Sequence, residues 1–477
     1  MAEWKMIDGY EMIIGLEVHV ELKTRTKIFC SCSTTYGAAP NTQCCPVCMG
    51  YPGTLPVLNG EVVHYAALAG LALGCDIALY SKQDRKNYFY PDLPKAYQIS
   101  QFDLPLCLGG GLDVEMPAGV KHIGITRIHI EEDAGKLIHD ERGTLIDCNR
   151  CGVPLIEIVS EPDIRTPQEA AAYLRKLRTV ILYTGVSDCR MNEGSLRCDV
   201  NLSIRKPGEP LGTRTEMKNL NSFQSVQRAI EAEYIRQVEA VRRGEAILQE
   251  TRRFDQATGL TYAMRRKENA HDYRYFPEPD LPPLVLTSEQ IGAWRSELPA
   301  LPDERKAAYV RDYGLTSYAA EQISSSKVVA DWFEEAAAST HAVKTLVNLM
   351  TTEVFRLMAA DDELIPMSAL HLAKIADMLQ EGEINGGTAK RTIAALWLHD
   401  EDPSAFVERS GLKQINDVAE LTLLVRRAID ENPAMVEKYR KGKETMKKAL
   451  MGAAMGLCGG RANPVKLQRL MDQALDN

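Results

Sequence analysis

A short alternating segment near the start of the chain constrains the fold more than any other feature. Glu17, His19 and Glu21 alternate with apolar residues between Leu16 and Leu22. A period of two residues is typical of a half-buried β-strand, so the three ionisable side chains project from one face. Such a row can bind a hard divalent cation together with phosphate groups, or it can be an ordinary solvated face. The pattern alone leaves both interpretations open.

Two further stretches place carboxylates on predicted strands. In the first, His129 and Glu131 alternate with isoleucines, and Glu132 follows at the end of the strand. In the second, Glu157 interrupts the apolar run 154–159, where a carboxylate is costly unless it is paired or bound to a metal. A buried ion pair with arginine explains any one of these acids. Three strands that each offer an inward acid favour a site for a metal and phosphate.

The cysteines form a compact pattern directly after the first strand. Cys30 and Cys32 make one close pair, and Cys45 and Cys48 make a second. Two such pairs joined by a short loop allow four thiolates to converge on one zinc ion, and this predicts a structural zinc site. A third pair, within residues 148–151, has no partner pair nearby, so we interpret it as two buried thiols.

Length and composition limit the class of protein. A chain of 477 residues is too long for one ordinary core, so we expect two or three domains. The formal charge of −9 argues against a protein that binds nucleic acid with its whole surface, but it is compatible with a local basic patch. No secretory signal opens the chain, and no apolar run is long enough to span a bilayer. Twelve cysteines then indicate a reducing compartment, and we expect a cytoplasmic protein.

The pattern of secondary structure changes along the chain. Up to about residue 295 it mixes short strands with a few helices, notably one that begins at Thr166 with a predicted capping box and ends at Gly185. A second helix is predicted over about 222–243, and the proline-rich segment 275–283 is expected to be extended.

Beyond Pro302 the pattern becomes one of short amphipathic helices. Asp-Glu-Asp-Pro at 400–403 marks a second boundary. The segment 438–469 is rich in lysine and arginine, with glycines among them. It can be a solvated helix face or a surface that contacts nucleic acid.

Basic and aromatic residues complement the acids. Arg85, Lys86 and Lys95 lie among tyrosines and a phenylalanine, a combination that suits stacking on a base or neutralising a phosphate. No glycine-rich phosphate loop and no serine nucleophile motif is present. The pattern therefore favours electrostatic chemistry without a covalent nucleophile.

Five strings of residues occur together and in order. They are Gly15–Leu22, Asp84–Asp92, Lys95–Gln101, Pro154–Asp163 and His271–Asp280. With these strings the chain resembles the GatB family, which supplies one of the subunits of the aspartyl/glutamyl-tRNA amidotransferases, from about residue 10 to the C-terminus.

The resemblance implies an α+β fold with three parts. Residues 1–295 would form a catalytic cradle domain with a mainly antiparallel sheet, similar to glutamine synthetase and the guanidino kinases. Residues 296–405 would form a helical domain, and residues 406–477 a small helical tail that contacts tRNA. The tail string Leu457–Pro464 is less basic than the corresponding string of many relatives.

The resemblance also implies a reaction and partners. A protein of this family would use ATP to phosphorylate the side-chain carboxylate of Glu or Asp misacylated onto tRNA. Ammonia released from glutamine by a separate glutaminase subunit would then displace phosphate, and a third, small subunit would make the complex a heterotrimer. The implied residues are Glu17, His19, Glu132 and Glu157 for Mg²⁺, with Mn²⁺ as an alternative; Lys86 and Arg85 for catalysis; Lys95 and Arg197 for ATP; and Cys30, Cys32, Cys45 and Cys48 for zinc.

Two other functions are compatible with the same residues. The chain could be a zinc-containing tRNA-binding scaffold whose acids are structural, which would tolerate loss of Glu17 or His19. It could also be a free-standing ligase that uses ammonia without partners. Stable association with two further subunits separates that ligase from a member of a complex.

Overall fold

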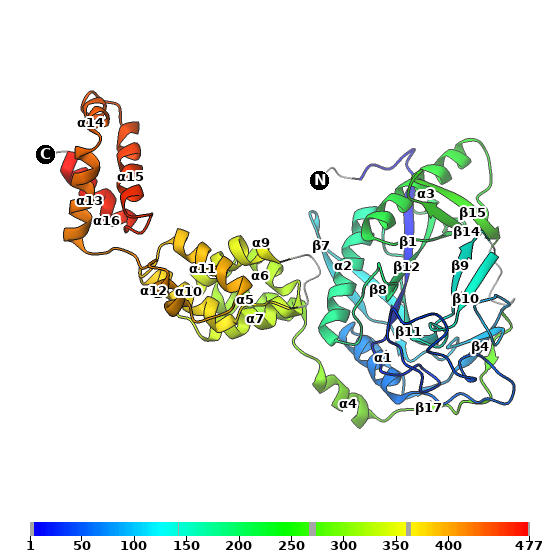
Figure 1. Ribbon diagram of the computed structural model, residues 1–477. Coiled ribbons are helices and arrows are strands. Elements are labelled where there is room, and N and C mark those ends of the chain that lie inside the picture. Colours follow the sequence, from blue (N-terminus) through cyan, green and yellow to red (C-terminus); the bar gives the residue numbers. More distant parts are fainter. Residues whose placement is uncertain (1–3, 142, 267–272, 359–363, 476–477) are drawn as a thin grey trace. The chain divides into compact units, whose positions relative to one another are not determined.

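The computed structural model describes residues 4–141, 143–266, 273–358 and 364–475. It divides into two compact units, Met1–Leu301 and Pro302–Asn477 (Figure 1). The first unit mixes strands and helices and the second is helical. The further division predicted near residue 405 stays a prediction.

A ten-stranded sheet organises the first unit. Its strands follow the order β15-β14-β13-β12-β1-β11-β8-β6-β2, and β7 also pairs with β8. Neighbours are antiparallel apart from β13 and β14, so the mainly antiparallel sheet expected from the resemblance is confirmed. The strands are β1 (Glu11–Glu21), β2 (Asp76–Ile77), β6 (Cys107–Leu108), β7 (Gly111–Met116), β8 (Gly119–Glu132), β11 (Pro154–Ser160), β12 (Leu196–Arg205), β13 (Thr215–Lys218), β14 (Glu250–Asp255) and β15 (Leu260–Arg266).

Apolar residues on alternate positions of the central strands hold three helices against one face of this sheet (Figure 1). In β1, Leu16, Val18 and Val20 are at most 1% exposed and point into this core, as the two-residue period predicted. The opposite face carries the polar residues of the same strands. The three helices are α1 (Gly60–Ala72), α2 (Pro167–Thr184) and α3 (Phe223–Arg242).

The ends of α2 agree with the signals in the sequence. The hydroxyl of Thr166 accepts the N–H of Glu169, and Gly185 closes the helix in a left-handed conformation with φ of 74°. Gly185 suits that position because it has no Cβ to clash. The carboxylate of Glu169 accepts the N–H of Arg165, one residue before the cap, at 2.7 Å.

The described part of the first unit also contains three smaller sheets. The segment predicted to be extended supplies β16 (Phe276–Pro277) and is followed by β17 (Leu284–Val285). These pair with β4 (Asp84–Asn87) and β3 (Tyr80–Ser81), so the extended prediction is confirmed. His271 and Asp272 of the fifth string lie outside the described residues. The other small strands are β5 (Tyr97–Ser100), β9 (Lys136–Asp140) and β10 (Gly143–Asp147), and α4 (Ser288–Glu297) ends the unit.

The second unit consists of short helices with apolar stripes, as the sequence predicted. Its last four helices share one hydrophobic core, which includes Leu421, Leu450 and Leu467. No helix in the described parts of either unit is long and apolar enough to cross a membrane. The helices are α5 (Pro302–Tyr313), α6 (Ser317–Ser324), α7 (Lys327–Ala338), α8 (Val343–Leu349), a π-helical turn (Met350–Val354), α9 (Phe355–Leu357), α10 (Ala369–Gln380), α11 (Gly386–Leu398), α12 (Pro403–Arg409), α13 (Val418–Asp430), α14 (Pro433–Arg440), α15 (Thr445–Leu457) and α16 (Pro464–Leu475).

Candidate active site and cysteine cluster

Strand register gathers ionisable side chains at the centre of the polar face. His19 on β1 lies opposite Glu157 on β11, and Glu157 lies opposite His129 on β8. Residues paired across neighbouring strands share a face, so the three side chains form one row. Glu131 lies two residues beyond His129 and therefore on the same face.

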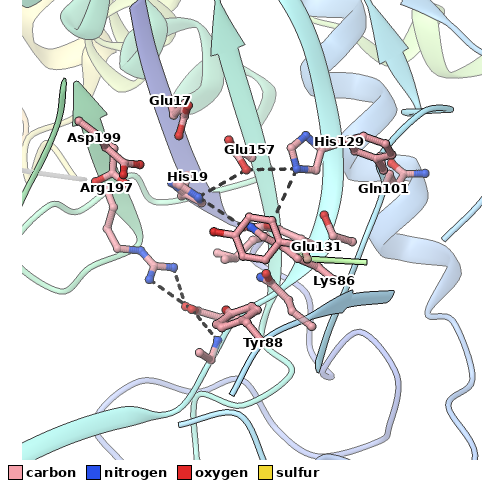
Figure 2. Close-up of a pocket in the computed structure, with 18 of the residues that line it drawn as sticks. Glu17, His19, Lys86, Tyr88, Gln101, His129, Glu131, Glu157, Arg197 and Asp199 are labelled. Atoms are coloured by element: carbon pink, nitrogen blue, oxygen red, sulfur yellow. Dashed lines mark hydrogen bonds and ion pairs between the residues drawn. The ribbon is translucent and has the colours of Figure 1, made fainter. Parts of the chain in front are cut away.

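These four side chains form the first acidic cluster (Figure 2). His19 Nε2 lies 3.4 Å from Glu131 Oε1 and 3.7 Å from Glu157 Oε2. His129 Nε2 lies 3.1 Å from Glu157 Oε2. One donor atom each from His19, Glu131 and Glu157 can be chosen so that all three lie within 4.8 Å of one another. Oxygen donors with one imidazole suit Mg²⁺ or Mn²⁺, so these residues can hold such a cation.

Opposite charges keep the buried acids ionised. Burial alone would raise the pKa of Glu131 and of Glu157, but hydrogen bonds and the charges of His129 and His19 lower both. Burial alone would lower the pKa of His129, but Glu157 and Glu131 raise it to about 9. The cluster is thus held as two carboxylates beside an imidazolium, ready for a cation.

Lys86 brings a positive charge to the same cavity, whose volume is about 460 Å³. Its Nζ lies 5.1 Å from the ring centre of Tyr273 and 5.9 Å from that of Tyr88. Burial opposes its charge, but Tyr275, Glu131 and Glu157 raise the pKa of Lys86 above its ordinary value. Lys86 is therefore an ammonium donor and not a base.

A second acidic cluster lies beside the first on the same sheet face. It consists of Glu17 on β1, Asp199 on β12 and Glu216 on β13, with one oxygen of each within 4.8 Å of the others. Lys218 is ion-paired with Asp199, and its Nζ lies 3.3 Å from Glu216. Asn201 donates to Glu17 at 2.9 Å. This cluster can also hold a cation, and all three acids line the same cavity.

Glu132, which the resemblance assigned to the metal site, lies elsewhere. Because successive residues of a strand point to opposite faces, Glu131 and not Glu132 faces His19. Glu132 instead binds Lys95, at 2.5 Å, and accepts the N–H of Ile99. Lys95 and Glu132 line a smaller cavity next to the cysteines. Neither is among the residues that line the large cavity.

The two arginines assigned to catalysis and to ATP are both engaged by acids. Arg85 donates to Glu278 at 2.6 and 2.8 Å, and Glu278 is fully buried. Arg85 is not among the residues that line the large cavity. Arg197 does line it, and its guanidinium binds Asp133 at 2.6 Å.

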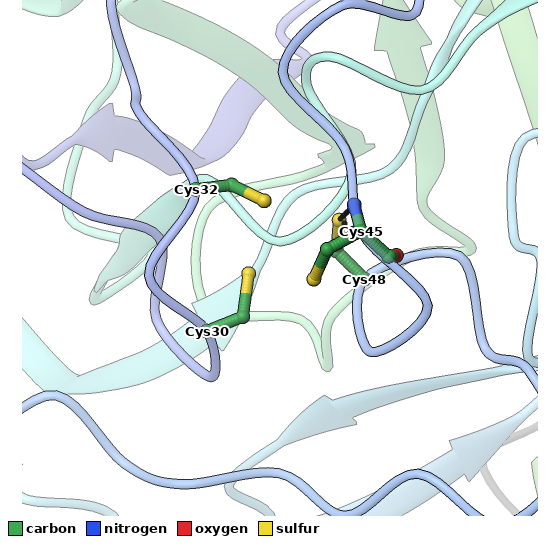
Figure 3. A group of neighbouring side chains, drawn as sticks. All are labelled: Cys30, Cys32, Cys45 and Cys48. Carbon is green, nitrogen blue, oxygen red and sulfur yellow. Dashed lines mark hydrogen bonds between the residues drawn. The ribbon is translucent and has the colours of Figure 1, made fainter.

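The four cysteines of the predicted zinc site come together as expected (Figure 3). The Sγ atoms of Cys30, Cys32, Cys45 and Cys48 all lie within 4.8 Å of one another. The Cys45 N–H donates to Cys48 Sγ at 3.2 Å. Hydrogen bonding from Cys30 lowers the pKa of Cys48 to about 4. Four close sulfurs are the donor set of a structural zinc site, and the residues fit that ion.

Some site residues had a usable signal in the sequence. Glu131 belongs to the same alternation as His129, and that period places it on the site face. Asp199 alternates with Cys198 and Val200 in the same way. The side chains that Glu131 and Asp199 contact could not be predicted from the sequence, because the tertiary fold determines which strands become neighbours.

Comparison with known proteins defines the class of the chain. Residues 12–292 match the family described as the GatB/GatE catalytic domain, and residues 331–475 match the GatB domain. The first match covers the sheet and both acidic clusters. The chain thus consists of a domain that matches this catalytic family, followed by a helical region that matches the GatB domain.

Full-length relatives define the family. The chain is 51% identical to the GatB subunit of the aspartyl/glutamyl-tRNA(Asn/Gln) amidotransferase from Caldicellulosiruptor saccharolyticus, over 98% of this chain and 99% of the relative. It is 52% identical to the corresponding protein from Caldanaerobacter subterraneus, with the same coverage. The chain belongs to the GatB family of aspartyl/glutamyl-tRNA(Asn/Gln) amidotransferase subunits.

Proposed function

We propose that this chain is the subunit that activates and amidates the aminoacyl group in a tRNA-dependent amidotransferase. It converts Glu-tRNA(Gln), Asp-tRNA(Asn) or both to the amidated forms. The carboxylate oxygen of the misacylated residue attacks the γ-phosphorus of ATP and releases ADP. Ammonia nitrogen then attacks the acyl carbon and releases phosphate. The observation that carries this proposal is the His19–Glu131–Glu157 cluster facing Lys86 in one cavity.

The residues of the two acidic clusters fit the divalent cation that such chemistry requires. His19, Glu131 and Glu157 would hold it, with Glu17 farther along β1 and Asp199 on the neighbouring strand β12. When bound, Mg²⁺ or Mn²⁺ would offset the negative charge of the phosphate groups. Glu131 and not Glu132 belongs to this proposed ligand set, because the Glu131 side chain points toward His19 and the Glu132 side chain points toward Lys95.

The remaining charged groups of the cavity suit the anions of this reaction. Lys86 keeps its proton, so it can stabilise the acyl phosphate and orient it for ammonia. Arg197 is held in place by Asp133 and lines the same cavity, where its positive charge can attract an anion. No covalent intermediate on the protein is needed, which agrees with the absence of a nucleophile motif.

The rest of the chain supports assembly and tRNA binding in this proposal. The cysteine cluster holds a structural zinc ion, and a glutaminase and a small third protein complete the complex. The basic segment 438–469 contacts tRNA in the cytoplasm. A non-catalytic scaffold of the same complex is the alternative, and it predicts that the buried acids can be neutralised without loss of turnover.

The deciding experiment uses the co-expressed three-subunit complex with Glu-tRNA(Gln), ATP and ammonium. Glu157→Ala should abolish Gln-tRNA formation while glutamine hydrolysis and tRNA binding persist. Glu239→Ala, which changes an exposed glutamate of α3, is the matched control and should turn over normally. Unchanged product formation by Glu157→Ala would leave only the scaffold role.

A further inference from the structure

Lys27 is a buried lysine directly beneath the cysteine cluster. Its side chain is 0% exposed, which is rare for lysine. Its Nζ lies 3.5 Å from Cys48 Sγ and 3.2 Å from the carbonyl oxygen of Cys148. Within the described part of the chain, no carboxylate lies at ion-pair distance from it. The buried ammonium therefore needs another anionic partner.

The cysteine cluster can supply that anion. Cysteines bind zinc as thiolates, so four of them with one Zn²⁺ carry a formal charge of about −2. A buried charge is tolerated when it is paired with an opposite charge and hydrogen-bonded. Lys27 supplies a positive charge and a hydrogen-bond donor to Cys48. This step rests on the zinc site proposed above.

The same lysine lies where the cysteine loop meets the loop at residues 148–152. The Lys27 N–H donates to the Cys32 carbonyl at 2.9 Å, and the next N–H, of Ile28, donates to the Gly152 carbonyl at 2.9 Å. The Gly152 N–H in turn donates to the carbonyl of Asp133, which lines the large cavity. A short chain of hydrogen bonds thus joins the cluster to the wall of the candidate active site.

We propose that Lys27 is the counter-ion of the zinc–thiolate centre and anchors it to the 148–152 loop. Its ammonium offsets the excess negative charge of the centre and donates to Cys48 Sγ and to the Cys148 carbonyl. Lys27 is a positioning residue: it holds the ligands and the loop, and it takes no part in the reaction.

The test compares Lys27→Met with Lys23→Met in the full three-subunit complex. Lys23 is an exposed lysine two residues beyond the end of β1 and four residues before Lys27, and it serves as the matched control. Zinc content is measured by mass spectrometry, and zinc release to a chromogenic chelator is followed in time. Lys27→Met should release zinc at least tenfold faster, the usual cost of removing a group that supports metal ligands, which is about 10–100-fold. Lys23→Met should behave like the wild type.

A second measurement separates a counter-ion from a mere packing role. In the zinc-loaded complex, Lys27→Met should lower the melting temperature. In the zinc-stripped complex it should not, because there the wild-type ammonium has lost its anionic partner. An equal loss of melting temperature with and without zinc would overturn the counter-ion role.

The outcomes distinguish this inference from the proposal on which it rests. A wild-type complex purified without zinc would remove the zinc site and the inference together. A wild type with one zinc and a Lys27→Met variant with unchanged release would overturn only the role of Lys27. Where Lys27→Met is not recovered in soluble form, Lys27→Gln replaces it, since it keeps a donor and loses only the charge.

Discussion

The neighbouring acids Glu131 and Glu132 provide a sharp test of the site because they differ by one position and face opposite ways. We expect Glu131→Gln to raise the Mn²⁺ concentration needed for ADP formation and to slow that step. We expect Glu132→Gln to leave the Mn²⁺ requirement within about threefold, which is ~0.65 kcal/mol. Each glutamine keeps the size of the side chain and removes only its charge.

The size of the effect follows from the geometry. The donor atoms of His19, Glu131 and Glu157 lie within 4.8 Å of one another, so a cation held by all three would lie within about 4 Å of the Glu131 carboxylate. At that separation and an effective dielectric constant of about 20, two unit charges interact by roughly 4 kcal/mol. The amide oxygen of glutamine keeps one weak ligand, and water can fill the remaining position. We therefore expect a net loss of ~3–4 kcal/mol, which is about 10²–10³-fold, similar to removing one electrostatic group from other active sites.

The assay is tRNA-dependent ADP formation by the three-subunit complex, with Mn²⁺ varied at saturating ATP. Thermal melting of each variant controls for folding, since Glu131 is buried. Equal Mn²⁺ requirements for the two variants, or a larger one for Glu132→Gln, would refute the assignment of Glu131 as the ligand.

Three further changes test other parts of the molecule. Lys86→Met should reduce Gln-tRNA formation by about 10²-fold or more with the Mn²⁺ requirement unchanged, because it removes an ammonium that meets the acyl phosphate; product analysis at varied Mn²⁺ checks this. Glu233→Gln should cost roughly 1–3 kcal/mol of folding stability, because it removes the charge of a buried carboxylate that accepts hydrogen bonds from the partly exposed Arg236 and from Thr215. Burial alone would raise the pKa of Glu233, but the hydrogen bond from Arg236 lowers it below its ordinary value of 4.5. The ionised Glu233 therefore stabilises the fold above pH 4.5, and this stabilisation is lost as the pH falls. Denaturation should show that Glu233→Gln lowers the free energy of unfolding less at pH 4 than at pH 7. Charge reversal at Lys438 and Lys443 should weaken tRNA binding. It should also reduce the slope of the logarithm of the binding constant against the logarithm of salt concentration by about 0.7–0.9 per lost phosphate contact. Reversal at the exposed Lys344 should change neither quantity, and binding titrations at several salt concentrations check both.

Local periodicity made much of the fold predictable. The alternation around His19 and around His129 correctly assigned their faces, because a strand has only two faces. The cap residues of α2 correctly bounded that helix, because they satisfy its own terminal groups. These features depend on residues close together in the chain.

Features that depend on distant residues were not predictable in this way. The second acidic cluster exists because β12 lies between β1 and β13, a strand order that no local pattern encodes. The burial of Lys27 depends on the loop at 148–152, more than a hundred residues away. The assignment of Glu132 came from the resemblance, and the two-residue period of the chain itself favoured Glu131.

The charges around the cavity explain how the site can be formed before any cation binds. Carboxylates on adjacent strands would repel one another, yet each cluster contains a basic group of the chain itself. His129 lies beside Glu157 in the first cluster, and Lys218 is paired with Asp199 in the second. Because these partners lie on the same rigid sheet, the acids stay ionised and aligned, and an arriving cation meets ligands already in place. Preorganisation of this kind limits the structural change required for phosphoryl transfer, which depends on positioning and charge.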